Sequence, residues 1–378
     1  MRDTTHLPPL RWRHGNRFRL LIDGTAFFPA LLTAIATARR QILLEMYLVE
    51  SGRLMDRFIA ALTAAADRGV RVCLLLDDFG CLGLNGNDRA RLQQRGVELV
   101  RYNPLRFGAL RRNLFRDHRK LIVIDDDCAF VGGAGLTDAF DPQSDPEHYW
   151  HDVLVEIRGP LVTDWQAVFD HNWRHWAQSA PVTVTPCPKS GPQVGRVSLA
   201  GSKTSTTITG TLLQRIGRAR QRIWLASGYF VPSWKLRRRL ARAARRGIDV
   251  RLLLPGPFTD HPAVRHAGRR FYRQLLRAGV RIYEYQPRFQ HAKVGLIDDW
   301  VTVGSSNLDR WNLRWNLEAN QEIDAPDFAA ETAAMLTTGF GQSLEMDYQS
   351  WGRRGWYARL AERFWGGVDR WVDSHLGR

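Results

Sequence analysis

The sequence predicts an α/β fold of two similar lobes, each a mostly parallel sheet flanked by helices. Three observations support this prediction. Landmarks recur in the same order in both halves of the chain, and each reads as a helical stretch that runs into an apolar strand, with a glycine between them in the second and third landmarks. A stretch rich in Pro, Ser, Thr and Gly separates the two copies. Apolar strands that alternate with helices favour a parallel sheet covered on both faces.

Three pairs of segments make up the repeat. They are ARRQILLEMYLVE (38–50) with ARQRIWLASGYFVP (219–232), AADRGVRVCLLLDD (65–78) with AARRGIDVRLLLPG (243–256), and RGVELVRYN (95–103) with AGVRIYEYQ (278–286). We therefore predict a first lobe over residues 10–177, a linker over 178–206, a second lobe over 207–345 and an amphipathic C-terminal segment over 346–378. Two such lobes can pack about a pseudo-twofold axis and share one central cleft.

Composition limits the classes of protein. A chain of 378 residues with 44% hydrophobic and 24% charged residues is typical of a globular protein and not of a disordered one. Its net charge of +16 attracts nucleic acid, anionic membranes or phosphate-bearing substrates. The scattered cysteines predict buried free thiols in a reducing compartment. The N-terminus lacks a hydrophobic signal core, and the apolar stretches stop short of the ~18 residues of a spanning helix, so we expect any membrane contact to be peripheral.

Each half closes with the same polar motif. The two copies read FRDHRKLIVIDDDCAFVGGAG (115–135) and FQHAKVGLIDDWVTVGSSNLD (289–309). His118 and Lys120 stand two residues apart, as His291 and Lys293 do, and this spacing puts both side chains on one face of a strand. Two copies at equivalent places of a repeat indicate a catalytic role rather than surface decoration.

The residue types suit phosphoryl transfer. Two histidines can divide the roles of nucleophile and general acid, while the two lysines and Asn307 can donate to phosphate oxygens. Gly133 and Ser305 follow the apolar runs, where the backbone can approach a bound group closely. Because no carboxylate or cysteine cluster suggests a metal, the sequence predicts neither a metal nor a cofactor, and charge neutralisation falls to Lys, Arg and backbone donors.

Each histidine needs a carboxylate that fixes its tautomer and stabilises its imidazolium form. Asp152 in HYWHDVLVEIRGP and Glu318 in RWNLEANQEI are the candidates. Asp125 and Asp298 complete the two catalytic motifs, and we expect them to support the strand-to-turn geometry rather than to contact the substrate.

The paired motifs resemble the His-x-Lys-x4-Asp signatures of the phospholipase D superfamily. NLFRDHRKLIVID, GSSNLDRWNLRWNLEAN and GRRFYRQLLRAGVRIYEY resemble the bacterial cardiolipin synthases that lack N-terminal membrane helices, and the likeness covers residues 10–345. The resemblance implies two phospholipase D-like lobes around one active site. It also implies phosphatidyl transfer through a phosphohistidine, with cardiolipin synthesis from phosphatidylglycerol and a second phospholipid or alcohol acceptor as the expected reaction.

The resemblance also implies a role for each group. His118 would attack the phosphorus, and His291 would protonate the leaving alcohol and then deprotonate the incoming one. Glu318 would pair with His118 and Asp152 with His291, so that each carboxylate serves the other lobe's histidine. The phosphate would be held by Lys120, Lys293 and Asn307.

This chain departs from the family pattern at two places. Gly135 stands where the family usually carries Asn, so either the first-half phosphate clamp is weaker or Thr137 substitutes for it. The step from Asp298 to Gly304 is one residue shorter than the usual spacing, which predicts a tighter turn.

Two other functions stay open on the sequence. The same histidine chemistry hydrolyses phospholipids and nucleic acids, so the main alternative is a phospholipase D-type hydrolase or a nuclease. The charge suits DNA, but no RRM, helix-turn-helix or zinc module is apparent, and we expect no nucleic-acid partner. An inactive binding protein on the same scaffold is disfavoured because both His-Lys pairs are intact.

Basic and aromatic stretches predict contact with an anionic phospholipid surface. In WGRRGWYARLAERFWGGVDRWVDSHLGR at the C-terminus, aromatic and aliphatic residues recur at helical spacing among arginines. The alternative is an amphipathic helix packed on the second lobe. The stretch LRFGALRRNLFR (105–116) stands just before His118 and would form a phosphate-attracting rim. We expect a peripheral location on the cytoplasmic face of the bacterial inner membrane.

Overall fold

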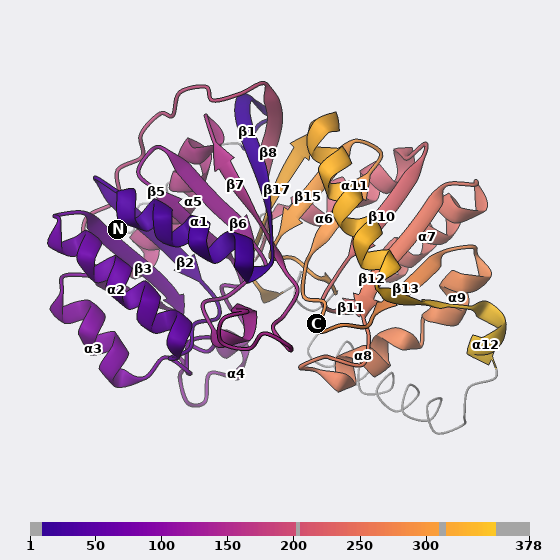
Figure 1. The fold of residues 1–378 in the computed structure, drawn as a ribbon, viewed down its shortest axis with the longest axis horizontal. Helices are drawn as coiled ribbons and strands as arrows, with labels where there is room; N and C mark the ends of the chain where they lie inside the picture. The colour runs from indigo at the N-terminus through magenta and orange to yellow at the C-terminus, as the bar shows by residue number, and fades with distance from the viewer. Residues whose placement is uncertain (1–9, 202–204, 310–314, 353–378) are drawn as a thin grey trace.

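The computed structural model describes residues 10–201, 205–309 and 315–352 (Figure 1). Two α/β lobes lie side by side, the first drawn from indigo to magenta and the second from pink to yellow (Figure 1). The α/β class and the two similar lobes predicted from the sequence are confirmed. Within the described ranges, we find no helix that combines the length and the apolar character needed to cross a membrane.

The first lobe begins with strand β1 and ends with helix α5. Its strands are β1 (Arg13–Ile22), β2 (Gln41–Met46), β3 (Arg71–Asp77), β4 (Glu98–Tyr102), β5 (Lys120–Ile124), β6 (Cys128–Gly132) and β7 (Val153–Arg158). Its helices are α1 (Asp23–Thr37), α2 (Arg53–Asp67), α3 (Gly86–Gln94), α4 (Leu110–Asn113) and α5 (Leu161–Trp176), with a 3-10 turn η1 (Asp138–Phe140). Strands β2, β5 and β6 are buried along their whole length, as expected for strands covered on both faces.

The second lobe repeats this plan with additions. Its strands are β8 (Gln193–Gly201), β9 (Ser205–Thr206), β10 (Arg222–Ala226), β11 (Phe230–Val231), β12 (Asp249–Pro255), β13 (Arg281–Tyr285), β14 (Val294–Ile297), β15 (Trp300–Gly304), β16 (Leu308–Asp309), β17 (Glu318–Asp324) and β18 (Ser343–Met346). Its helices are α6 (Thr207–Arg218), α7 (Trp234–Arg245), α8 (Pro262–Arg269), α9 (Tyr272–Arg277), α11 (Pro326–Gly341) and α12 (Tyr348–Gly352).

The three repeated landmarks coincide with β2, β3 and β4 in the first lobe and with β10, β12 and β13 in the second. Both triplets pair in parallel. The strands that follow a Gly break are preceded by a glycine with positive φ, a conformation that ends a helix and that side chains rarely adopt. These glycines are Gly69, Gly96, Gly247 and Gly279, with φ between 80° and 92°.

The prediction of a mostly parallel sheet is wrong in detail. Within the described residues, one 16-stranded sheet runs through both lobes in the order β18-β13-β12-β10-β14-β15-β17-β8-β1-β7-β6-β5-β2-β3-β4, with β9 on β8. The strands outside the two parallel triplets join it in antiparallel pairs, for example β5 with β6 and β14 with β15. Fully buried strands are apolar in either orientation, so their composition did not reveal the direction of pairing.

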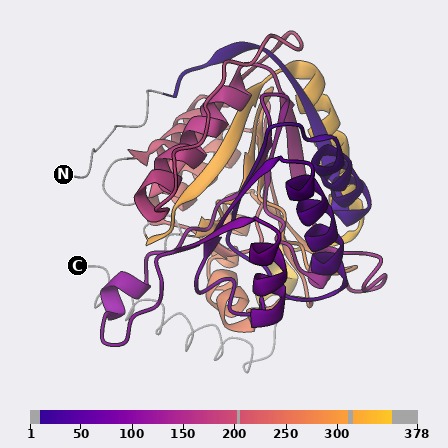
Figure 2. The same cartoon turned by 90° about the vertical axis from the view of Figure 1, so that its left-hand side faces the viewer.

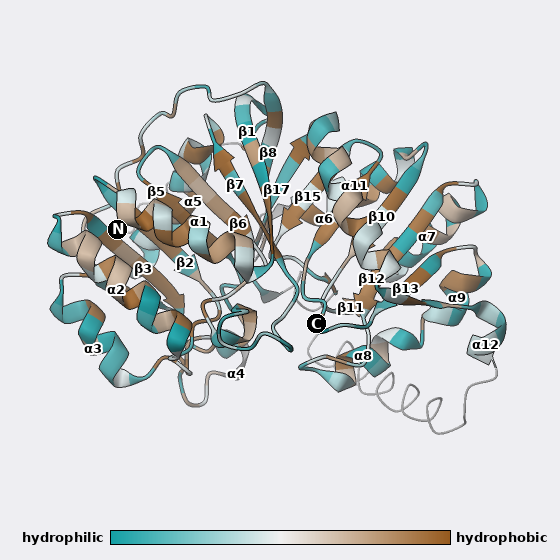
Figure 3. Ribbon diagram, viewed as in Figure 1, coloured by the Kyte–Doolittle hydropathy of each residue, from teal (hydrophilic) through white to brown (hydrophobic). Residues whose placement is uncertain are grey.

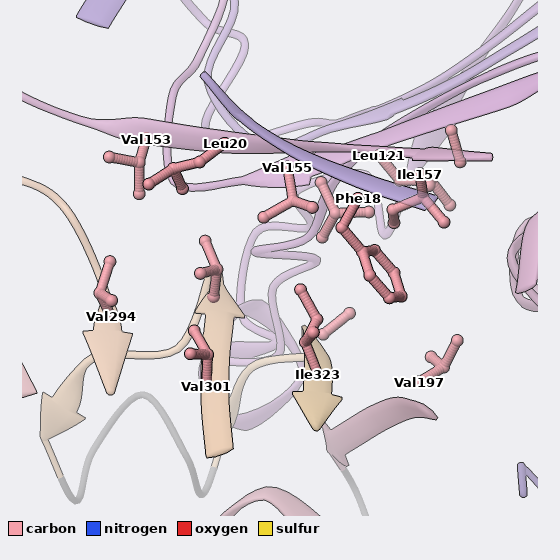
Figure 4. Close-up of a cluster of buried hydrophobic side chains, with 14 of the residues drawn as sticks. Phe18, Leu20, Leu121, Val153, Val155, Ile157, Val197, Val294, Val301 and Ile323 are labelled. Atoms are coloured by element: carbon pink, nitrogen blue, oxygen red, sulfur yellow. The ribbon is translucent and has the colours of Figure 1, made fainter. Parts of the chain in front are cut away.

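The lobes share an apolar core. Leu20, Val153 and Val155 of the first lobe face Val294 and Val301 of the second across their interface (Figure 4). Separate clusters fill the outer side of each lobe, beneath α1 and α2 in the first and beneath α6 and α7 in the second. Brown apolar strands therefore run through the middle of the molecule, while α2, α3 and α7 turn teal polar residues outward (Figure 3). This extensive contact fixes the position of one lobe against the other.

The segment predicted as a linker is partly a strand. Residues Gln193–Gly201 form β8, which pairs with β17 along its length and touches β1 at two positions. Val197 and Leu199 of β8 point into the shared core, and this burial outweighs the turn-like composition of the segment. Beyond Gly352, the predicted C-terminal amphipathic segment lies outside the described residues.

Candidate active site

The two motifs meet at the edge of the sheet where the parallel strands end. Lys120, the first residue of β5, pairs with Met46 at the carboxyl end of β2. Val294, which follows Lys293, pairs with Ala226 at the carboxyl end of β10. Because β6 and β15 run back to this edge and β7 and β17 start from it, each lobe brings all parts of its motif there.

Backbone hydrogen bonds between the lobes hold each histidine. The His118 N–H donates to the Leu317 carbonyl at 3.0 Å, and the Leu317 N–H donates to Arg116 at 2.9 Å. In the matching position, the His291 N–H donates to the His151 carbonyl at 2.9 Å. The accepting residue directly precedes Glu318 in one case and Asp152 in the other. Each histidine is therefore fixed by the other lobe at the start of a carboxylate-bearing strand.

Each imidazole also contacts a carboxylate from the opposite lobe. Nδ1 of His118 lies 3.0 Å from Oε1 and 3.1 Å from Oε2 of Glu318. Nδ1 of His291 lies 2.6 Å from Oδ2 of Asp152. Both carboxylates are fully buried, so they have little water to replace these contacts. An ionised carboxylate only accepts hydrogen bonds, so the proton of each neutral imidazole sits on Nδ1 and the lone pair on Nε2.

Burial controls the protonation of the site. Burial lowers the pKa of His118 in spite of Glu318, and burial together with Lys293 lowers the pKa of His291 to about 4. Burial also raises the pKa of Asp152, but Lys293 and the hydrogen bond to His291 outweigh it and hold that pKa below the usual value. Without substrate, the site therefore holds neutral imidazoles beside ionised Asp152.

The two lysines occupy equivalent places. Nζ of Lys120 donates to the carbonyl of His118 at 2.7 Å, and Nζ of Lys293 donates to the carbonyl of His291. Nζ of Lys293 also lies 2.9 Å from both ring nitrogens of His291. Burial lowers the pKa of Lys120 to about 7 and that of Lys293 to about 8. An anion bound beside them would raise the pKa of both lysines, because a nearby opposite charge favours the ammonium form.

The remaining residues predicted to hold a phosphate divide into two kinds. Oδ1 of Asn307 accepts the Tyr229 N–H at 3.1 Å, while its buried Nδ2 meets no partner within the described part of the chain and is available to a substrate oxygen. Ser305 and Gly133 lie against carboxylates instead. The Ser305 hydroxyl donates to Glu318, and a Cβ on Gly133 would fall 2.5 Å from both oxygens of Asp152.

In the first half, Gly135 offers no side chain at the place that corresponds to Asn307. A Cβ on Gly135 would fall 2.6 Å from the Leu48 carbonyl, so an Asn there would require the backbone to move. The Thr137 hydroxyl accepts the Ala139 N–H at 3.1 Å and caps η1. The two halves are thus unequal in their donors, although their histidines are held alike.

Asp125 and Asp298 lie at turns rather than with the histidines. Each follows an apolar strand with a φ of 51°. The Asp125 carboxylate accepts the N–H groups of residues 39, 40 and 41, and that of Asp298 accepts those of residues 220, 221 and 222. The structure thus separates these two residues from the rest of the predicted catalytic set and gives them a role in holding the turn.

Replacing Asp125 with asparagine is expected to destabilise the fold by about 2 kcal/mol, because an amide NH2 would face backbone donors. The folded protein should keep its kcat. Urea unfolding gives the stability, and turnover per folded molecule gives the activity. A large loss of kcat with unchanged stability would restore Asp125 to the catalytic set, and Asp298→Asn provides the matched variant in the second lobe.

Replacing Gly133 with alanine is expected to reduce kcat by about 10²-fold, because the new Cβ must displace Asp152 from His291. The matched control is Gly86→Ala, since a Cβ at Gly86 meets nothing within 4 Å. Initial rates and thermal unfolding of both variants separate the two effects. Equal activity of the two variants would show that Asp152 is not needed at its present position.

Neither the motifs nor the periodicity of the sequence indicated the aromatic rings that surround the histidines. The Tyr47 ring lies 4.6 Å from His118 between centroids, and Nζ of Lys120 lies 5.1 Å from the Tyr47 centroid. His291 is surrounded by four rings with centroids 5.2 to 6.2 Å away, those of Phe140, Trp150, Tyr229 and Phe289. These contacts join residues far apart in the chain, so periodicity could not find them.

A third buried histidine, His151, supports the site from behind. Nδ1 of His151 lies 2.7 Å from Oδ1 of Asp23, which also accepts the Asp152 N–H at 3.2 Å. Arg288 of the second lobe donates to the other oxygen of Asp23 at 2.5 Å. This group ties both lobes to the backbone that carries Asp152. The sequence HYWHD contains His151 next to Asp152. Only the fold brings Asp23, and with it Arg288, to this pair of residues.

Comparison with known proteins identifies the family. The family model described as "Cardiolipin synthase, PLD-like domain" matches residues 31–173 and 212–338, and therefore both lobes. The chain belongs to this family. It is 36% identical over 337 residues to cardiolipin synthase A of Pseudomonas aeruginosa strain LESB58, which covers 88% of this chain and 68% of that protein. It is also 36% identical over 319 residues to cardiolipin synthase B of Salmonella typhi, which covers 82% of this chain and 76% of that protein.

Solved structures share the fold of this cardiolipin synthase-like chain. The phosphatidylserine synthase of Haemophilus influenzae Rd KW20 superposes with a TM-score of 0.74 at 13% identity, over 98% of this chain and 97% of that one. A polyphosphate kinase from Porphyromonas gingivalis superposes with a TM-score of 0.60 at 14% identity, over 88% of this chain and 49% of that one. At these identities the likeness concerns the fold alone. The membership of the phospholipase D superfamily that the sequence predicted is confirmed by the family match.

Proposed function

We propose that this protein synthesises cardiolipin by transferring the phosphatidyl group of phosphatidylglycerol to a second phosphatidylglycerol or another alcohol acceptor. The observation that carries the proposal is the pair of histidine–carboxylate contacts between the lobes, His118 with Glu318 and His291 with Asp152. Two imidazoles held in this way at one site suit a double displacement. The family and its cardiolipin synthase relatives supply the lipid substrates.

In the first step, Nε2 of His118 attacks the phosphorus of the donor. A P–N bond forms, the P–O bond to the headgroup glycerol breaks, and the leaving oxygen takes a proton from His291. Lys120, Lys293 and the Nδ2 of Asn307 hold the non-bridging oxygens. The negative phosphodiester raises the lowered pKa values of the lysines and of His291, so that substrate binding itself supplies the acid form of His291.

In the second step, the neutral His291 takes the proton from the acceptor hydroxyl. That oxygen attacks the phosphorus, the P–N bond breaks, and His118 leaves as the neutral imidazole with its Nδ1 proton directed to Glu318. The aromatic rings around His291 limit the access of water to the general base, which favours transfer over hydrolysis.

The pH dependence of kcat/KM follows from the lowered pKa values. His118 attacks as the neutral imidazole, and its pKa below the usual 6.5 keeps it in this form at neutral pH. The lysines bind phosphate as ammonium ions, which lose their protons as the pH rises through about 7 for Lys120 and about 8 for Lys293. Because His291 must also gain a proton when the substrate binds, we expect kcat/KM for a monomeric short-chain phosphatidylglycerol to fall as the pH rises through this range. A rate that stays flat to higher pH would show that these ammonium charges are not required.

We extend the proposal to the roles of the two lobes and to the location of the protein in the cell. The first lobe (10–177) and the second lobe (207–345) each supply half of the site, and the chain works on anionic phospholipids at the surface of a bilayer, as a peripheral protein on the cytoplasmic face of the bacterial inner membrane. The +16 charge supports this partner, because basic side chains are attracted to anionic headgroups.

The products distinguish this function from its alternatives. The full chain is incubated with phosphatidylglycerol vesicles, with and without phosphatidylethanolamine, and separately with plasmid DNA. Mass spectrometry should detect diphosphatidylglycerol and free glycerol, plasmid should remain intact, and EDTA should leave the rate unchanged. Phosphatidic acid as the main product would indicate a hydrolase, and nicked plasmid without lipid product would indicate a nuclease.

A further inference from the structure

Two neighbouring loops of the first lobe expose large apolar side chains to solvent. Phe79 is 51% exposed and Leu82 is 61% exposed in the loop after β3, while Leu105 is 40% exposed and Phe107 fully exposed in the loop after β4. We call these four residues the loop patch. The violet segment with α4, which continues the second loop, stands away from the body of the molecule (Figure 2). Clustered apolar residues of this size on a soluble surface indicate an interaction site.

Hydrogen bonds hold the two loops together. The Leu105 N–H donates to Oδ2 of Asp78 at 2.9 Å, and the Asp78 N–H donates to the Tyr102 carbonyl at 3.1 Å. The loops are also tied to the active site, because Oδ2 of Asp77 accepts at 2.8 Å the N–H of Asp117, the residue before His118. The loop patch therefore lies on a fixed base at the edge of the sheet that bears the histidines.

Arginines outnumber carboxylates around the loop patch, where Arg101 pairs with Asp78 at 3.1 Å. Residues 101–116 contain five arginines and no Asp or Glu, and residues 79–87 contain no Asp or Glu. Arg101 and Arg106 are exposed beside the patch. Exposed apolar side chains among arginines match the interfacial region of an anionic bilayer, where the rings reach the acyl boundary and the guanidinium groups meet phosphates.

The second lobe adds apolar residues on the same edge. Phe258, 43% exposed, follows β12, the counterpart of β3, and Trp234, 58% exposed, begins α7 after β10 and β11. The Phe258 ring lies 6.4 Å from that of His148, so this loop touches the first lobe. Exposed apolar groups thus occur on both lobes where the carboxyl ends of the parallel strands meet.

We infer that the loop patch docks the enzyme on an anionic phospholipid bilayer and places the active-site edge against the lipid headgroups. This inference rests on the proposed function and identifies the surface that reaches the substrate. A membrane-embedded diester can reach His118 without leaving the bilayer only if this edge faces the lipid. Phe107 and Leu105 enter the interface, while Arg106 between them binds a headgroup phosphate.

A dye on residue 107 tests docking directly. Because all four native cysteines are buried, Phe107→Cys offers a selective position for an environment-sensitive fluorophore such as NBD. Val184→Cys is the matched control, since Val184 is 39% exposed beside Thr183, whose carbonyl accepts from Gln41 at the amino end of β2. Vesicles of phosphatidylcholine with phosphatidylglycerol should shift the emission at 107 to the blue and raise it several-fold, with no change at 184.

Activity on two forms of substrate separates docking from catalysis. Leu105→Ser with Phe107→Ser should lower cardiolipin formation from phosphatidylglycerol vesicles by roughly tenfold or more, because two apolar side chains no longer enter the bilayer. Turnover of monomeric short-chain phosphatidylglycerol should be unchanged. Val184→Ser should affect neither rate.

Several outcomes would overturn the inference. The dye emission at 107 could stay unchanged with anionic vesicles, or it could shift equally with pure phosphatidylcholine. The emission could also shift with protein concentration in the absence of vesicles, which would report a second copy of the chain. Finally, the double serine variant could lose both rates equally. Docking at 107 by a wild-type enzyme that makes no cardiolipin would instead contradict the proposed function and leave the docking surface in place.

Discussion

Replacing His118 with alanine is expected to abolish phosphatidyl transfer, with a loss of kcat of about 10⁶-fold, because the P–N bond then has no nitrogen to form on. The remaining groups can bind the diester but offer no nucleophile to divide the reaction into two steps. Cardiolipin formed from phosphatidylglycerol vesicles, measured by mass spectrometry over long incubations, gives the residual rate.

The control for this variant is His148→Ala. His148 belongs to the first lobe, but its side chain is 62% exposed and it lies outside the paired motifs. Replacing His148 should leave kcat within a factor of about two of the wild-type value, which corresponds to a small change in the activation free energy. Circular dichroism and thermal unfolding establish that both variants are folded. A His118→Ala protein that is folded and retains a substantial part of the wild-type rate would exclude His118 as the nucleophile.

Replacing His291 with alanine is expected to reduce turnover by a similar factor and to leave the nucleophile in place. A phosphatidyl ester of p-nitrophenol, whose leaving group needs no proton, should therefore transfer its phosphatidyl group to His118, with the P–N bond formed and the P–O bond to p-nitrophenolate broken, and stop there. The loss of the general base slows the second step, since the acceptor hydroxyl keeps its proton. One equivalent of p-nitrophenol should appear in a burst, followed by a much slower steady state.

The burst separates the roles of the two histidines. The wild-type enzyme should release p-nitrophenol over many turnovers, and the double variant with His118→Ala and His291→Ala should release none above background. Absorbance in a stopped-flow instrument measures all three proteins at equal concentration. A burst that survives in His118→Ala and is absent in His291→Ala would exchange the two assignments.

The sequence was informative wherever the fold repeats a local pattern. The landmarks located β3, β4, β12 and β13, because a glycine with positive φ has a recognisable place before each of these strands. The strands β2 and β10 were located by the apolar run that follows a basic helix tail. The sequence did not indicate whether β5 and β6 pair in the parallel or the antiparallel direction. The segment LIVIDDDCAFV reads as two buried strands in either sense, and the antiparallel return depends on the turn at Asp125.

The strand β8 shows how tertiary pairing overrides composition. Its segment reads as a linker by its glycines and serines, yet Val197 and Leu199 alternate toward the core and the strand pairs with β17 of the same lobe. β8 also reaches β1 of the first lobe, and this contact continues the sheet across both lobes. A single sequence does not display such partners, because they depend on a register set elsewhere in the chain.

Some residues of the candidate site could be predicted from the sequence, and others became apparent only in the structure. The repeat of His-x-Lys marked His118 and His291 without any structure, since two equivalent copies in one chain seldom arise by chance. Which residues contact the carboxylates, and which are left to contact a substrate, could be seen only in the structure. Ser305 contacts Glu318, and Gly133 leaves room for Asp152, although both had been expected to serve a phosphate. Asp23 and Arg288 entered the site only because two lobes far apart in sequence pack together.

The location of the covalent phosphatidyl group tests the account most directly. His291→Ala enzyme is mixed with the p-nitrophenyl ester, digested at neutral to alkaline pH to preserve the phosphohistidine, and analysed by tandem mass spectrometry. The account predicts one phosphatidyl group per protein, on the peptide that contains His118, and its transfer to added glycerol when wild-type enzyme is treated in the same way. Phosphatidyl on any other residue, or cardiolipin formation by an enzyme that never carries a covalent phosphatidyl group, would contradict it.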